Sequence, residues 1–184
     1  MPTDIALAST NEIERRESMA VCKRAFERLL PLNPFAWVVH LSDLDTPHGH
    51  QNGSLESAQR SIDELCTLVS PTTIAIETLT DDLSYQEEII KSSGLSVCLD
   101  VGHLALGGYD LDRVWEKWHD HILVVHMHGI DKGKDHKDLR FLTNKTIDSI
   151  LTRTPHNRVT TIEVFGEEKL VESLKVVSCL TKVV

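Results

Sequence analysis

The apolar residues of this chain fall into short continuous runs separated by stretches with helical spacing. A short apolar run without a helical period is typical of a buried parallel strand. Five such runs are predicted as strands: residues 35–40, 72–77, 96–100, 121–128 and 158–163. Six helices are predicted around them: residues 11–30, 54–69, 84–92, 111–119, 145–153 and 167–180. Residues 1–10 show neither pattern, and we take them as a loop.

The alternation of strands and helices predicts an α/β fold with a parallel sheet and right-handed crossovers. Eight such units close a TIM barrel, which typically needs about 250 residues. We therefore expect residues 1–184 to form a single β/α-barrel domain that lacks its first strands and is incomplete at its N-terminus. The alternative is an open parallel sheet of five strands that is complete as it stands.

Every predicted strand ends on a side chain that can bind a metal or move a proton. The residues at these ends are His40, Glu77, Asp100, His126 with His128, and Glu163. Ligands of parallel α/β proteins bind beyond the carboxyl ends of the strands, which meet at one edge. We therefore expect these side chains to gather in one site.

The strand over residues 96–100 is the clearest of the five. It stops on Asp100, turns at Gly102, and presents His103 three residues later, before the glycine pair at 107–108. A charge at the mouth of an apolar strand is costly unless a metal or a substrate compensates for it.

Carboxylates and imidazoles together form a mixed oxygen and nitrogen donor set that suits Mn, Zn, Co or Fe. We expect a divalent metal on Glu77, Asp100, His126 and Glu163, with positions left open for water and substrate. A glutamate that is not a ligand is a candidate general base, so we count Glu77 and Glu163 as catalytic. His103 is the third catalytic candidate, as a contact to substrate or to a second metal; the structural alternative is a hydrogen bond to the turn.

The charged loop after residue 128 offers a second set of candidates. His40, His128, Asp135 and His136 are candidates for a second metal or for substrate contact. Lys132, Lys134, Lys137 and Arg140 are candidates for binding a phosphate through charge-assisted hydrogen bonds. The alternative for this segment is a solvated loop without a specific role.

Composition narrows the classes of function. The chain has 184 residues, 41% of them hydrophobic, and a net charge of −9. This charge argues against nucleic acid as a partner, because duplex binding draws much of its affinity from basic residues. The sequence has no long apolar segment and no signal-peptide pattern, so we expect a cytoplasmic protein that does not enter a membrane. The four cysteines form no Cys-x-x-Cys motif, so they do not indicate a zinc knuckle.

Taken together, several of these motifs resemble a known superfamily. The segments Ile76-Glu77, Cys98-Leu-Asp-Val-Gly-His103, Val125-His126 with Gly129, and Ile162-Glu-Val164 are similar to those of the sugar phosphate isomerase and apurinic endonuclease family 2 barrels, which are xylose-isomerase-like. The resemblance implies a metal on the matching strand ends. It also implies that Asp135 and His136 correspond to a ligand pair for another metal, although relatives have a residue between the two.

A narrower resemblance lies in two segments. The opening run Pro2-Thr-Asp-Ile-Ala-Leu-Ala-Ser9 and the run His126-Met-His-Gly-Ile-Asp-Lys-Gly-Lys-Asp-His-Lys-Asp-Leu139 look like the cobamide-remodelling phosphodiesterases, which hydrolyse the nucleotide loop of B12-type cofactors. The resemblance implies a metal-dependent hydrolase that cleaves a phosphodiester.

Two alternative functions remain open. The first is a sugar isomerase or epimerase that uses a metal and two glutamates, and the second is an inactive truncated barrel. The expected partner is a small phosphodiester or sugar. A five-stranded sheet also has exposed edges, through which we expect homo-oligomers to form.

Overall fold

The computed structural model of the protein describes residues 5–41, 54–79 and 81–181. It divides into two compact units, Met1–Cys98 and Leu99–Val184. The prediction of a single domain over residues 1–184 stays a prediction.

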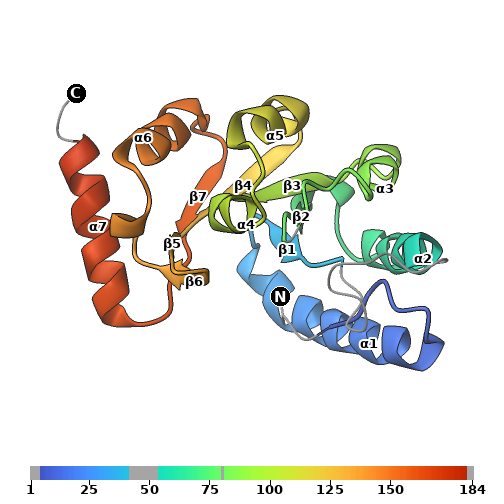
Figure 1. Cartoon of the computed structure of the whole chain (residues 1–184). Helices are drawn as coiled ribbons and strands as arrows, with labels where there is room; N and C mark the ends of the chain where they lie inside the picture. The colour runs from blue at the N-terminus through green and yellow to red at the C-terminus, as the bar shows by residue number, and fades with distance from the viewer. Residues whose placement is uncertain (1–4, 42–53, 80, 182–184) are drawn as a thin grey trace. The chain divides into compact units, whose positions relative to one another are not determined.

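The first unit alternates helices with parallel strands (Figure 1). Its elements are α1 (Glu12–Leu29), the 3-10 turn η1 (Leu30–Leu32), β1 (Trp37–Val39), α2 (Ser54–Cys66), η2 (Pro71–Thr73), β2 (Ile74–Glu77), α3 (Glu87–Ser92) and the start of β3 (Ser96–Asp100). The side chain of Asn11 caps α1 by accepting a hydrogen bond from the Ile13 N–H. Strand β1 pairs in parallel with β2, and β2 pairs in parallel with β3.

The core of the first unit lies between α1, α2 and these strands. Phe26 of α1 stacks on Trp37 of β1, with 4.0 Å between the ring centroids. The described part of the predicted N-terminal loop, residues 5–10, has no regular structure, but Ile5–Ala8 are buried. The Ser61 hydroxyl donates to the Leu7 carbonyl at 2.7 Å, which ties this segment to α2. The segment therefore belongs to the core and is not a surface loop.

The second unit begins within β3 and continues with four helices and four further strands. Its elements are α4 (Val101–Leu106), α5 (Leu111–Trp118), β4 (Ile122–Met127), β5 (Gly129–Asp131), β6 (Lys134–Lys137), η3 (Leu139–Phe141), α6 (Asn144–Arg153), β7 (Val159–Ile162) and α7 (Glu167–Thr181). Strands β4 and β7 run side by side in parallel, with His126 opposite Thr161 (Figure 1). Trp115 and Trp118 of α5 are buried in its core.

All five predicted strands and all six predicted helices are found, with shorter bounds for several. Two segments predicted as a turn and a loop contain regular structure. The turn predicted at Gly102 is the short helix α4, because the Asp100 side chain caps it by accepting from the His103 N–H. The predicted loop after residue 128 contains the antiparallel hairpin β5–β6. Its turn residues Lys132 and Gly133 both have positive φ, as a tight two-residue hairpin turn requires.

Strand β7 also differs from the buried run that its sequence indicated. Its residues are alternately exposed and half-buried, and Val159 is 38% exposed. Within the described ranges, no helix is both long enough and apolar enough to cross a membrane.

Candidate functional site

Asp100 lies at the end of β3 and directs its two carboxylate oxygens to different partners. Oδ1 accepts a hydrogen bond from the His103 backbone N–H at 2.7 Å. Oδ2 lies 3.8 Å from His126 Nδ1 and 3.7 Å from His103 Nδ1. The side chain is fully buried. A buried carboxylate with this surrounding of imidazoles is a typical ligand of a cation.

His126 and Glu163 come from the ends of β4 and β7. The parallel ladder continues one residue past β7, where the Glu163 N–H donates to the Met127 carbonyl at 2.9 Å. This hydrogen bond places Glu163 beside His126, and Glu163 Oε2 lies 2.9 Å from His126 Nδ1. Asp100, His126 and Glu163 each offer one ligand atom, and these atoms lie within 4.8 Å of one another.

These separations fit a shared metal ion. Two ligand atoms that each lie about 2.1 Å from one cation are at most about 4.2 Å apart. The distances from His126 Nδ1 to Glu163 Oε2 and to Asp100 Oδ2, 2.9 and 3.8 Å, are within that limit. Two carboxylates and one imidazole are also a donor set that divalent transition metals accept. Asp100, His126 and Glu163 therefore suit the divalent metal that the sequence predicted.

Glu77 and His40 lie in the first unit. Glu77 ends β2 and is buried, and its Oε2 is 2.9 Å from His40 Nε2. The structure thus brings these two predicted site residues together. The role of Glu77 as a fourth ligand or general base stays a prediction, and so does the role of His40.

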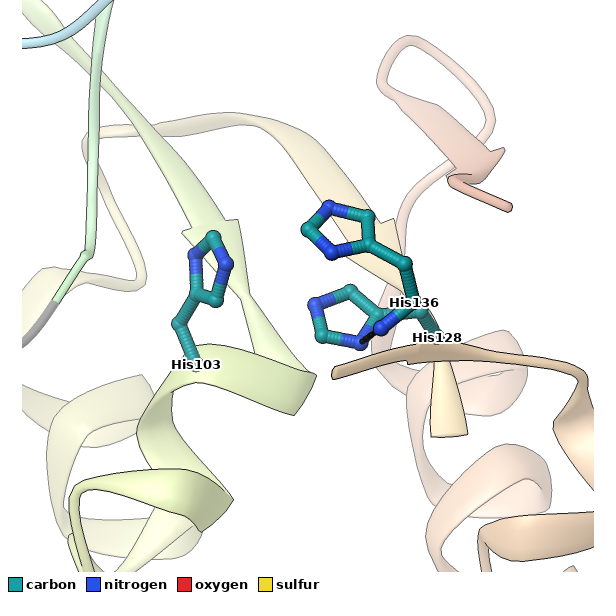
Figure 2. Close-up of side chains that lie close together, drawn as sticks. All are labelled: His103, His128 and His136. Carbon is teal, nitrogen blue, oxygen red and sulfur yellow. Dashed lines mark hydrogen bonds between the residues drawn. The ribbon is translucent and has the colours of Figure 1, made fainter. Parts of the chain in front are cut away.

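Three histidines form a second cluster within the second unit (Figure 2). His103 comes from α4, His128 follows β4, and His136 lies in β6. The rings of His128 and His136 are stacked, with centroids 4.4 Å apart, and His103 lies 5.0 Å from His128 and 5.6 Å from His136. One nitrogen from each of the three rings lies within 4.8 Å of those of the other two.

Asp135 adds a carboxylate to this cluster. Its Oδ1 lies 3.1 Å from His136 Nδ1, and its Oδ2 lies 3.9 Å from His103 Nε2. The hydrogen bond from His136 lowers the pKa of Asp135 below its ordinary value, so Asp135 is a carboxylate at neutral pH. His136 Nε2 is 3.9 Å from Glu163 Oε2, so the histidine cluster adjoins the candidate metal ligands.

A β-bulge sets the position of His136. The pairs Gly129 with Lys137 and Asp131 with Lys134 leave one extra residue on β6, and His136 has a positive φ of 50°. Bulges commonly redirect a side chain next to a functional site. The imidazole ring of His136, which lies at the bulge, stacks on the ring of Phe165, with centroids 4.7 Å apart. Phe165 could not be found from the sequence, because nothing in the pattern around a single aromatic residue indicates this contact.

Burial and the nearby Asp100 carboxylate shift the pKa of His128 in opposite directions. Burial is the largest single effect and lowers the pKa of the imidazole, but Asp100, the Gly129 carbonyl and Glu163 together raise it by more, so the pKa is higher than the ordinary 6.5. His128 Nε2 lies 3.0 Å from Asp100 Oδ1, and both side chains are fully buried. His128 therefore contacts a candidate ligand directly.

The four basic residues of the loop lie in different environments. Lys132 and Lys134 are exposed in the hairpin, and Lys137 is half-buried. The Arg140 guanidinium donates to Asp138 from Nε at 2.7 Å, and its Nη1 is 3.3 Å from Glu172. Arg140 thus contributes to the structure of the segment after β6, and its phosphate-binding role stays a prediction.

The fold resembles solved structures of epimerase-like and endonuclease proteins. A D-tagatose 3-epimerase-like protein matches with a TM-score of 0.79 and 18% identity, over 100% of this chain and 75% of that chain. The IolI protein, solved with a zinc atom, matches with a TM-score of 0.73 and 15% identity. The match covers 97% of this chain and 74% of that chain. A family 2 AP endonuclease from Brucella melitensis matches with a TM-score of 0.60 and 17% identity, over 90% and 68%.

The chain has the xylose-isomerase-like barrel fold. This confirms the predicted fold class, an α/β fold of the TIM-barrel type that matches part of a barrel. No protein-family model matches the sequence, and no curated protein sequence matches it.

Proposed function

We propose that this protein is a metal-dependent hydrolase that cleaves a phosphodiester. The metal would be held by Asp100, His126 and Glu163. The observation that supports this most is the short distance between their donor atoms at adjoining strand ends, 2.9 and 3.8 Å from His126 Nδ1. Mn, Zn, Co and Fe all suit this donor set. The same fold holds zinc in the IolI protein.

The metal and the protein side chains would have different roles in phosphodiester hydrolysis. A divalent metal supplies a water of lowered pKa and polarises a phosphoryl oxygen. Glu77, if it is not a ligand, would take the proton from the attacking water. The water oxygen bonds to phosphorus, the bond from phosphorus to the ester oxygen breaks, and the proton taken by the glutamate passes to the departing oxygen.

The histidine cluster supports a phosphorylated substrate over a simple sugar. His103 and His136 lie beside the candidate ligands, with His136 Nε2 3.9 Å from Glu163 Oε2. Imidazole N–H groups donate to phosphate oxygens, and protonated imidazoles do so with charge assistance. We assign His103 and His136 to the phosphate oxygens or to a second metal, with Asp135 orienting both rings. Lys132, Lys134 and Lys137 would add positive charge on the hairpin.

The substrate we favour is the nucleotide loop of a cobamide. This choice depends on the resemblance of residues 126–139 to the cobamide-remodelling phosphodiesterases. The substrate is a small molecule that carries one phosphodiester. Hydrolysis at its phosphorus would release a riboside and leave cobinamide phosphate.

A paired measurement tests the proposed function. The purified chain is analysed for bound metal and then incubated with a cobamide and each of Mn, Zn, Co and Fe. We expect bound metal and metal-dependent release of the riboside and cobinamide phosphate. Metal binding without any phosphodiester cleavage would contradict the hydrolase, and absence of metal binding would contradict the site itself.

A sugar epimerase or isomerase is the second candidate. The TM-score of 0.79 with a D-tagatose 3-epimerase-like protein favours it, as does the presence of two glutamates at strand ends. Glu77 and Glu163 would exchange a proton with a substrate carbon. Uptake of solvent deuterium into a ketose would support this function and count against the hydrolase. A stable protein with neither activity would support the inactive truncated barrel. Homo-oligomers through sheet edges and a cytoplasmic location stay predictions.

A further inference from the structure

His128 has polar contacts at both ring nitrogens although its side chain is fully buried. Nε2 lies 3.0 Å from Asp100 Oδ1. Nδ1 accepts a hydrogen bond from the His136 backbone N–H at 3.0 Å, the contact drawn as a dashed line in Figure 2. The carbonyl of Gly129 lies 3.2 Å from the same nitrogen.

The shorter contact at Nδ1 favours one tautomer of the neutral ring. A backbone N–H can only donate, so the contact from His136 at 3.0 Å needs the lone pair on Nδ1, whereas the Gly129 carbonyl at 3.2 Å would need a proton there. We take the shorter contact to decide, which puts the ring proton on Nε2, 3.0 Å from Asp100 Oδ1. The hydrogen bond at one nitrogen of a histidine determines what the other nitrogen can do.

Steric contacts hold the ring in this orientation. A Cβ added at Gly102 would lie 2.1 Å from His128 Cε1 and 2.3 Å from Nδ1, so only glycine leaves room for the ring there. The opposite face of the His128 ring is stacked against His136, with 9° between the ring planes. The ring is therefore enclosed between α4 and the bulge of β6.

We propose that His128 is a positioning residue and that it holds Asp100 and His136 in place at the same time. Through Nε2 it holds Asp100 Oδ1, which leaves Oδ2 on the side of His126. Through Nδ1 it holds the backbone of His136 in its left-handed conformation at the bulge. This inference rests on the proposed function for the use of Asp100 as a ligand. It extends that function by linking the metal ligands to the β5–β6 hairpin.

Two substitutions separate the contacts of His128. In His128→Gln, the amide nitrogen can replace Nε2 and keep the donor to Asp100, but the acceptor for His136 is lost. In His128→Asn, the amide oxygen can replace Nδ1 and keep that acceptor, but the donor to Asp100 is lost. His156→Gln is the matched control, because His156 is exposed. Thermal unfolding by circular dichroism checks that each variant is folded.

The first readout is the dissociation constant for Zn in competition with a chelator. Loss of a residue that orients a metal ligand typically weakens metal binding about 10- to 100-fold. We expect this loss for His128→Asn, while His128→Gln and His156→Gln stay within about threefold of the unsubstituted protein. Unchanged affinity in His128→Asn, or an equal loss in both His128 variants, would overturn the positioning of Asp100.

The second readout needs no metal. Hydrogen exchange at the His136 amide, measured by NMR on metal-free protein, should be roughly fivefold or more faster in His128→Gln than in His128→Asn, as expected for one lost hydrogen bond. The ring nitrogens of unsubstituted His128, recorded at about pH 8.5, should show the Nε2–H tautomer. Equal exchange in the two variants, or an Nδ1–H tautomer, would overturn the proposal.

The two readouts distinguish failure of this inference from failure of the proposed function. If the unsubstituted protein binds no metal, the proposed function fails, and the tautomer and amide exchange still decide whether His128 holds Asp100 and His136. If it binds metal but His128→Asn binds equally well, the proposed function stands and the role of His128 fails.

Discussion

Glu163 Oε2 lies 2.9 Å from His126 Nδ1, although the β5–β6 hairpin, α6 and β7 all lie between the two residues in the chain. Their proximity follows from the parallel register of β4 and β7, which puts His126 opposite Thr161 and leaves Glu163 just beyond the strand. Each strand end thus supplies one donor atom, an imidazole nitrogen and a carboxylate oxygen. A side-chain pair of this kind at the carboxyl edge of a sheet is suited to hold a cation.

Removal of a single proposed ligand should strongly weaken metal binding and leave the fold intact. We expect Asp100→Asn and His126→Ala each to weaken Zn or Mn binding by at least about 100-fold, since the loss of a direct ligand should exceed that of an orienting group. Isothermal titration measures the affinity, and circular dichroism checks the fold. Asp120→Asn is the matched control, because Asp120 is exposed. Metal content at the unsubstituted level in both variants would exclude them from the ligand set.

Glu77→Gln tests the residue that the sequence placed in the site and that lies in the first unit. The amide keeps the shape of the side chain but cannot take a proton and is a poorer ligand. We expect hydrolysis to fall about 100-fold or more, the usual contribution of a general base. A loss of metal affinity in the same variant would identify Glu77 as a ligand, and unchanged affinity would identify it as the base. Glu168→Gln on the surface is the control, and full activity in Glu77→Gln would remove Glu77 from the site.

Gly102→Ala should destabilise the protein although Gly102 lies in a helix. Alanine normally stabilises a helix interior by about 1 kcal/mol relative to glycine. Here the new Cβ would lie 2.1 Å from the His128 ring, and overpacking of this kind costs about 1 to 3 kcal/mol. Urea unfolding should therefore show a net loss. Gly102→Ala should cost less stability in a His128→Ala background than in the unsubstituted protein, because that background lacks the ring that the new methyl group would meet. A stabilised single variant would contradict the predicted clash.

Asp138→Asn should destabilise the protein at neutral pH but not at low pH. The side-chain hydrogen bonds from Arg140, at 2.7 and 3.1 Å, lower the pKa of Asp138 below its ordinary 3.8. A carboxylate with a lowered pKa in the folded state stabilises it above the unfolded pKa, and this contribution is lost as the pH falls through the folded pKa. We expect a loss of about 1 to 2 kcal/mol at pH 7, because Arg140 is half exposed.

Urea unfolding at a series of pH values measures this difference between Asp138→Asn and the unsubstituted protein. The difference should be constant at neutral pH and shrink below about pH 3.8. Asp120→Asn again serves as the exposed control. A difference that does not change with pH would show that Asp138 acts only through its shape, as the cap of η3.

The pattern of the sequence determined which segments become strands and which residues end them. An apolar run needs burial wherever it lies, so the strands ending near His40, Glu77 and His126 were predictable without coordinates. The approach of His126 to Glu163 was also implied, because parallel strands place their carboxyl ends at one edge. The sequence predicted β7 as a buried strand, whereas the structure leaves alternate residues exposed, since burial depends on what packs against each face.

Tertiary structure alone decided how the loop after β4 folds and what His128 does. The charged residues 129–140 show no hydrophobic period, so their hairpin could not be predicted from periodicity. The helix α4 was missed for a related reason, since its start depends on the Asp100 side chain capping the His103 N–H. His126 and His128 are equivalent in the sequence pattern, both facing the same side of a strand. Only the packing of the His128 ring against Gly102 and His136 distinguishes them, because contacts between distant segments, and not local propensity, decide which atoms a buried ring meets.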